Sequence, residues 1–171
     1  MSASERDAAG AGTPTGGSLE AKIAAAHLGA ELGRIQDGTA YWRIAPERVA
    51  QAVAFLKQSG CERFLDLTVV DDPTRQDRFE LNYLLYSMRD QRWFRLEAST
   101  AAEAPSIVSI FLGAAFYERE VYDLFGVRFL GHPDLKRILL PDDWQGHPLR
   151  RDHPLGGEPV DFTVTREVYG T

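Results

Sequence analysis

Cysteine is nearly missing from this sequence, since Cys61 is the only one in 171 residues. A single thiol cannot form an internal disulfide, and it cannot supply the four thiolates that usually hold an iron–sulfur cluster. Long apolar runs are missing as well, because no stretch approaches the roughly 18 to 20 residues that span a bilayer. We therefore expect a chain that does not cross a membrane and carries no conventional cluster of its own.

A surplus of positive charge is also missing. The chain has 19 Lys and Arg against 25 Asp and Glu, which gives a net charge of −6. This balance offers no electrostatic support for nonspecific binding to nucleic acid or to an anionic membrane. Any association with a membrane is therefore expected to run through a protein partner.

Residues 1–18 contain no Leu, Ile, Val or aromatic side chain. With so little to bury, they are predicted to form a flexible N-terminal tail. They also lack the apolar central region and basic start of a secretory signal, so we expect a cytosolic protein. The length of the chain fits one domain with one core.

Two helices are predicted in the first half of the chain. The alanine-rich stretch 19–28 favours a helix that Gly29 would end. A second helix is expected to begin at Pro46, which suits a first helical position, and to end near Gly60. Its apolar face is formed by Val49, Val53 and Leu56.

Strands are predicted where the hydrophobic period changes to two. In residues 64–71, Leu65, Leu67 and Val69 alternate with polar residues, as in a half-buried strand. The other expected strands are residues 41–44, 79–86 and 93–98, the last two forming a hairpin. Together with the helices they predict an α+β fold of two layers: a mostly antiparallel sheet of three to four strands, with helices on one face.

The chain is expected to change character at Gly126. Before it, a helical stretch is predicted from Pro105 and Ser106 through Leu112, followed by a helix at 115–125. After it, five prolines break helices and remove strand donors. Many large apolar side chains nevertheless remain, which predicts an extended arm at 126–171 that buries them against another chain. The predicted parts are thus a tail at 1–18, an α+β domain at 19–125 and this arm.

Charged residues crowd the helix at 115–125. Arg119 and Asp123 lie four residues apart and could pair, although such a pair contributes only roughly a few tenths of a kcal/mol when exposed. A solvated helix face is the simplest interpretation. Beside an apolar arm we favour a network of ion pairs that fixes the arm or a partner, because arginine offers bidentate geometry to carboxylates.

A metal site in the arm is an alternative. Three histidines there each precede a proline, and with nearby aspartates they could form a mixed nitrogen and oxygen site. Their spacing does not match a preformed helical site and basic residues are interleaved, so hydrogen bonds to the backbone or to a neighbouring protein are favoured. The residues concerned are His132, His147, His153, Asp134, Asp142, Asp143 and Asp152.

Nucleophilic or phosphate chemistry finds less support. Cys61 lies between a predicted helix and a predicted strand, where a small buried residue is typical. The glycines of the N-terminal tail follow no strand, so they do not form a phosphate-binding loop. The sequence offers no convincing active site of its own.

The stretch 118–139, EREVYDLFGVRFLGHPDLKRIL, closely resembles the signature of the thirty-kilodalton subunit family of NADH-quinone oxidoreductase, which is respiratory complex I. The similarity continues through 141–155, PDDWQGHPLRRDHPL, and reaches upstream through the predicted sheet to about residue 40. Two positions depart from the family pattern. Phe116 stands where tryptophan is usual, and His153 stands where an aromatic residue is common.

The resemblance implies a cofactor-free structural subunit in the peripheral arm of respiratory complex I, which couples electron transfer from NADH to quinone to proton translocation. Iron–sulfur clusters, FMN and quinone sites would belong to other subunits. The implied partners are the quinone-site subunit and neighbouring iron–sulfur subunits, on the cytoplasmic side of a bacterial inner membrane. Two alternatives stay open: the equivalent subunit of a ferredoxin-linked or hydrogenase complex, and a stand-alone metal-dependent hydrolase that uses the arm.

No catalytic, cofactor-binding or metal-binding residue is expected in this chain. Partner-binding residues are expected on the charged helix and along the arm. They are Glu118, Arg119, Glu120, Asp123, His132, Arg137, Asp142, Asp143, Trp144, His147, Leu149, Arg150, Arg151 and Asp152.

Overall fold

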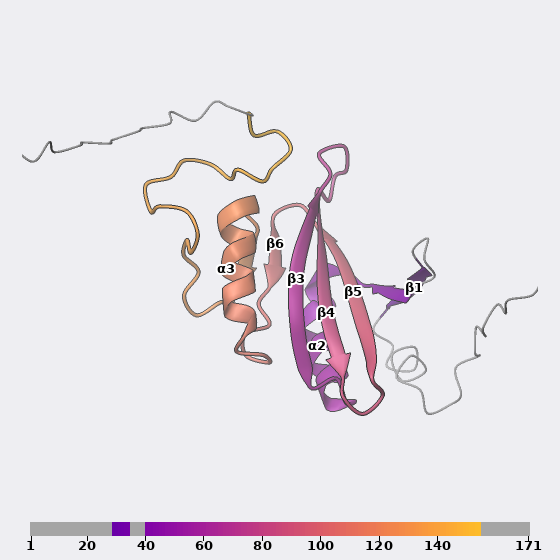
Figure 1. Ribbon diagram of the computed structural model, residues 1–171. Coiled ribbons are helices and arrows are strands. Elements are labelled where there is room, and N and C mark those ends of the chain that lie inside the picture. Colours follow the sequence, from indigo (N-terminus) through magenta and orange to yellow (C-terminus); the bar gives the residue numbers. More distant parts are fainter. Residues whose placement is uncertain (1–28, 35–39, 155–171) are drawn as a thin grey trace, which may run out of the picture.

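The computed structural model describes residues 29–34 and 40–154 (Figure 1). The predicted tail at 1–18, the predicted helix at 19–28 and the last part of the predicted arm, 155–171, lie outside these residues. The described chain combines sheet and helix, so the predicted α+β class is confirmed.

A five-stranded sheet forms the centre of the fold, in the order β1-β2-β5-β4-β3. All neighbouring strands are antiparallel except β2 and β5, which run parallel. The mostly antiparallel sheet is as predicted, with more strands than the three to four expected. The strands are β1 (Glu31–Arg34), β2 (Ala40–Arg43), β3 (Arg63–Asp71), β4 (Phe79–Ser87) and β5 (Arg92–Thr100).

Helix α2 (Val49–Gln58) covers one face of the sheet and lies behind it in Figure 1. It continues from a short 3-10 helix, η1 (Pro46–Arg48), where proline's missing N–H costs no hydrogen bond. The buried positions recur three and four residues apart, as an amphipathic helix requires, and include Val49, Val53 and Leu56. The predicted helix and its apolar face are confirmed.

Strand β4 supplies the middle of the core. Phe79, Leu81, Tyr83 and Leu85 are at most 2% exposed and lie on one side of the strand. This is the face that the alternation of the sequence predicts. The predicted hairpin with β5 is also present, with Leu81 opposite Ala98.

Strand β3 departs from the predicted alternation. A β-bulge between Phe64 and Asp66 shifts the register against β4. Phe64 therefore packs against the core, where it stacks on Phe111 and meets Tyr117 edge-on. The expectation that Leu65 belongs to the core face is wrong, because a period of two cannot continue through the extra residue of a bulge.

Residues 106–112 form turns, so the predicted helix there is wrong. Strand β6 (Glu103–Pro105) pairs in parallel with β7 (Arg128–Leu130), and the N–H of Ser106 donates to Leu130 O at 2.9 Å. A backbone N–H group at the start of the predicted helix thus donates to a carbonyl far along the chain. Strand β7 also shows that regular structure continues past Gly126, contrary to expectation.

Helix α3 (Ala114–Phe125) packs beside β3 and ends at Gly126, whose φ of 77° is left-handed. Residues 131–154 contain no helix or strand and fold back over α3 (Figure 1). We call residues 131–154 the strap. No helix in the described part of the chain is long and apolar enough to cross a bilayer.

Candidate partner-binding site

Asp123 fastens the start of the strap to helix α3. Its Oδ2 accepts the backbone N–H groups of Ile138, Leu139 and Leu140 at 3.0, 2.8 and 2.9 Å. Its Oδ1 accepts a bond from Arg137 Nη1 at 2.6 Å. Burial alone would raise the pKa of this fully buried carboxyl, but these donors hold the pKa at about 2. A stable carboxylate therefore anchors the strap at neutral pH.

Two arginines extend this anchor. Arg119 donates to the carbonyls of Lys136 and Arg137 at 3.1 and 2.7 Å, so its predicted pairing with Asp123 is wrong. Arg137 binds Asp123 instead, and its other nitrogen donates to the carbonyls of Trp144 and Gly146. The start of the predicted arm is therefore fixed to α3 by one ion pair and by hydrogen bonds to backbone carbonyls, and the larger ion-pair network that was favoured stays a prediction.

The end of α3 is covered by a second group of strap side chains. His147 Nδ1 donates to Asp123 O at 2.9 Å, and Arg150 Nε donates to Phe125 O at 2.6 Å. These bonds satisfy helix carbonyls that have no intrahelical partner. Gly126 makes room for them, because a Cβ there would collide with the guanidinium of Arg150 and the ring of His147.

The far end of the strap is held at the turn between β3 and β4. Arg78 bonds to both Asp71 and Asp152, and Asp71 Oδ2 also accepts the N–H of Arg151 at 2.7 Å. Hydrogen bonds from Arg78 lower the pKa of Asp71, and they lower that of Asp152 to about 2. The strap is thus anchored by charge at both ends.

Glu118 is fully buried and does not lie on a solvated helix face. Its Oε1 accepts the N–H of Ile107 at 2.7 Å. Burial raises the pKa of Glu118 to about 7, although hydrogen bonds from Ser106 and Ile107 act against this rise. Its Oε2 and the hydroxyl of Tyr83 are buried without a hydrogen-bond partner among the described residues. The carboxyl therefore links α3 to the 106–112 turns from inside the core.

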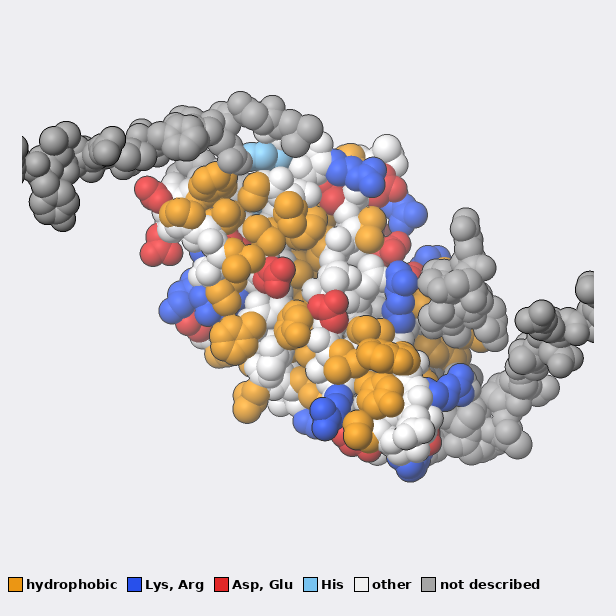
Figure 2. All heavy atoms as spheres, viewed as in Figure 1, with side chains coloured by type: hydrophobic (Ala, Val, Ile, Leu, Met, Phe, Trp, Pro, Cys, Tyr) orange, Lys and Arg blue, Asp and Glu red, His pale blue; other side chains and the backbone are white. Residues whose placement is uncertain are grey.

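The remaining predicted site residues lie on the surface of the strap or of α3. Leu149 is 52% exposed, and Glu120, Asp142 and Asp143 are exposed as well. Trp144 is half-buried, with its indole N–H turned inward. Hydrophobic side chains gather over α3 and the strap in Figure 2, with acidic ones among them. Leu139, which is 60% exposed, was not among the predicted residues and belongs to this surface.

His132 and His147 make separate contacts. His132 Nε2 donates to Ala115 O at 3.2 Å, while its Nδ1 accepts the N–H of Asp134, which places the hydrogen on Nε2. His147 bonds to Asp123 O, so both imidazoles bond to backbone as favoured above. Across residues 29–34 and 40–154, no three His, Cys, Asp or Glu side chains are grouped to hold a metal ion.

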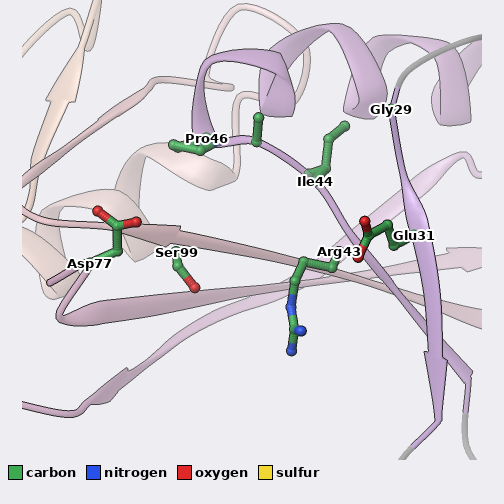
Figure 3. Close-up of a pocket in the computed structure, with 8 residues that line it drawn as sticks. Gly29, Glu31, Arg43, Ile44, Pro46, Asp77 and Ser99 are labelled. Carbon is green, nitrogen blue, oxygen red and sulfur yellow. The ribbon is translucent and has the colours of Figure 1, made fainter. Parts of the chain in front are cut away.

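An open pocket lies between the β1–β2 end of the sheet and the β3–β4 turn (Figure 3). Its polar lining consists of Glu31, Arg43, Asp77 and Ser99, and no imidazole is among its lining residues to activate the serine. Cys61 is buried, as predicted, and burial raises the pKa of its thiol to about 12. Neither place has the features of a nucleophilic site.

Asp71 and Arg78 anchor the strap, although sequence reasoning did not identify them. Asp71 lies on the same, core-facing side of β3 as Leu67 and Val69, and it is 4% exposed. A carboxylate in a buried phase of a strand requires a partner. The position of Asp71 on the buried side of the strand could have indicated a paired carboxylate, although it could not identify Arg78 or the strap as the partner.

Comparisons with known proteins agree with the resemblance. The family model described as "Respiratory-chain NADH dehydrogenase, 30 Kd subunit" matches residues 42–159. A subunit of NADH-quinone oxidoreductase from Roseiflexus castenholzii is 39% identical over 155 residues, 87% of each chain. The protein of the same name from Chelativorans is 42% identical over 139 residues, covering 73% of this chain and 68% of that one. The mitochondrial 30.4 kDa subunit of NADH-ubiquinone oxidoreductase from Neurospora crassa is 44% identical over 119 residues, but only 42% of its length is covered.

Two solved structures share the fold. One is the trypsin-resistant fragment (1–134) of Nqo5, with a TM-score of 0.60 and 29% identity, covering 68% of this chain and 96% of the fragment. The other belongs to the membrane-bound sulfane sulfur reductase, an archaeal respiratory membrane complex, with a TM-score of 0.70 over 80% of this chain and 84% of that one. At 24% sequence identity, this likeness shows a shared fold alone. The chain belongs to the 30 kDa subunit family of the respiratory-chain NADH dehydrogenase, also named NADH-quinone oxidoreductase.

Proposed function

We propose that this chain is a cofactor-free supporting subunit in the peripheral arm of NADH-quinone oxidoreductase, on the cytoplasmic side of the membrane. It holds neighbouring subunits in place, chiefly the one that shapes the quinone site, and the strap with the segment beyond it is the docking element. Electron transfer and proton translocation belong to the assembled complex. A rigid support of this kind keeps redox groups and the quinone site in fixed positions.

The observation that carries this proposal is the contrast between the two sides of the strap. Its inner side is fixed by Asp123 and Arg78, so its backbone is held in one conformation. Its outer side presents Leu139 and Leu149, which are exposed in this chain. Apolar side chains on a preorganised backbone bind a partner without a large loss of conformational entropy. The strap therefore has the properties of a docking surface.

The relatives support the same interpretation. Proteins that share this family are named as subunits of NADH-quinone oxidoreductase, and one solved relative is a trypsin-resistant fragment. We propose that the present chain is divided in a similar way, with a compact α+β domain that includes β7 and an arm, from the strap onwards, that gains its full protection in the complex.

Replacement of Leu139 and Leu149 by Asp tests this function. Both side chains are exposed, and the N–H of residue 139 that binds Asp123 stays in place, so circular dichroism of the purified variant should be unchanged. Native gels of membranes that carry the variant should show much less assembled complex. Leu32→Asp is the matched control, since Leu32 is 50% exposed on β1, away from the strap. Normal assembly of the double variant would contradict a docking role for the strap.

The type of complex is tested by what co-purifies with the tagged chain in mild detergent. An NADH dehydrogenase module supports the function proposed here. A ferredoxin-linked or hydrogenase module would instead assign the chain to the equivalent position in one of those enzymes.

A further inference from the structure

A second surface of the chain lies on the outer face of the sheet, at its end opposite to the strap anchors. There Arg63 of β3 stands opposite Tyr86 of β4, and Tyr86 stands opposite Trp93 of β5. Residues directly opposite in a sheet point to the same side, so these three side chains form one row across three strands. Tyr86 and Trp93 meet edge-to-face with ring centroids 5.1 Å apart.

This row is exposed. Trp93 is 62% and the neighbouring Met88 51% exposed, and the Arg63 side chain is exposed as well. In Figure 2 hydrophobic side chains gather where β4 turns into β5, with basic side chains on both sides. An aromatic group of this size in contact with water is costly, and such patches mark sites of interaction.

The bulge of β3 creates the row. If the register beyond the bulge continued unshifted, Phe64 would stand opposite Tyr86 and Arg63 opposite Ser87. With it, Phe64 turns towards the core and Arg63 turns outward beside the two aromatic rings. Bulges commonly re-aim a side chain next to a functional site, and this one replaces an aromatic residue of the row by a cation.

We propose that the row of Arg63, Tyr86 and Trp93 docks a protein partner that presents carboxylates around an apolar hollow. Tryptophan, tyrosine and arginine are the residues that most often dominate the energy of a protein interface. Among the described residues no carboxylate forms an ion pair with Arg63, so its charge is available to a partner. The chain as a whole is acidic, with a net charge of −6, whereas Arg63 brings a positive charge beside the two aromatic rings. A carboxylate-bearing protein complements both properties of the patch.

This surface is additional to the strap. Arg63 begins β3, whereas Asp71, which anchors the strap, ends it. The two surfaces therefore lie at opposite ends of the β3–β4 pair, and the chain can contact two neighbours at once. The inference rests on the proposed function in one respect, because the partner is expected to be a protein of the same assembly.

Zero-length cross-linking tests the chemistry of the partner directly. In Arg63→Lys the positive charge remains, and a water-soluble carbodiimide joins the new amine to any carboxylate that contacts it. Complex purified through a tag on this chain should yield one peptide that links position 63 to an Asp or Glu of another protein. Arg128→Lys serves as the control, because Arg128 already pairs with Glu103 of the same chain at 3.2 Å and should link to it.

Each result decides a different point. A complex without any link at position 63, or with links only to this chain or a second copy of it, overturns the proposed surface while the strap function stands. Recovery of the tagged chain without other subunits overturns the proposed function and this surface together. In a second measurement, Trp93→Ala should weaken retention in the complex about tenfold as salt is raised, and Trp93→Phe should weaken it less. Retention equal to wild type at every salt concentration would overturn the proposal.

Discussion

Glu118→Gln should stabilise the chain at alkaline pH, although Glu118 lies in the most characteristic motif of the sequence. Burial raises the pKa of this carboxyl from 4.5 to about 7 in the folded chain. In the unfolded chain it titrates at its ordinary value, so the folded state prefers the protonated form. The stability that this preference supplies is complete below pH 4.5 and is lost as the pH rises through about 7.

The magnitude follows from the same two values. The difference between 4.5 and about 7 corresponds to about 3 kcal/mol between the two protonation states. Glutamine is neutral at every pH and keeps an oxygen that can accept the N–H of Ile107. The variant should therefore match wild type near pH 4, and at pH 8 its free energy of unfolding should be higher by about 1 to 3 kcal/mol.

Urea unfolding at several pH values between 4 and 8, followed by circular dichroism, measures this difference. Other carboxyls also titrate, but subtracting the variant from wild type at each pH isolates Glu118. Glu120→Gln is the matched control, because Glu120 is exposed on the same helix and its replacement changes no buried group. A stability difference that does not change with pH, or a variant that is less stable at pH 8, would refute the reasoning.

Two further predictions concern the strap. Asp123→Ala removes the acceptor of three backbone N–H groups and leaves Arg137 without its carboxylate, so urea unfolding should show a loss of about 3 kcal/mol or more. Retained stability would mean that the anchor contributes little to the fold. Gly126→Ala should lower the free energy of unfolding by more than about 1 kcal/mol, because φ is 77° and the added Cβ would collide with Arg150. Gly113→Ala is its control, with open space around the added carbon and a loss expected near zero.

Much of the sheet and both described helices could be predicted because their signals are local. In α2, Pro46 sets the start and Val49, Val53 and Leu56 recur at helical spacing. In β4, the alternation that begins at Phe79 places every second side chain in the core. These patterns repeat over nine or more residues, so tertiary contacts only reinforce them.

The errors occurred where a distant partner overrides a local preference. A helix was expected after Pro105, but the N–H of Ser106 goes to Leu130 O and that of Ile107 goes to Glu118. The spacing of Arg119 and Asp123 allows a helical ion pair. Asp123 instead receives donors from residues 137–140, which a window of one or two helical turns does not contain.

The charged helix could be recognised as a site before its partners could be known. The apolar stripe along α3 implies that one side of the helix is buried. The helix carries more charged residues than its exposed side can hold, so some of them must be buried and paired inside the protein. Asp123 and Glu118 are both buried, yet their surroundings differ in one respect. Asp123 faces four donors and keeps a low pKa, whereas Glu118 faces few and has a raised one. Which carboxylate anchors the strap and which one titrates near neutral pH therefore depends on the number of donors that the distant chain delivers, and that number is a property of the fold.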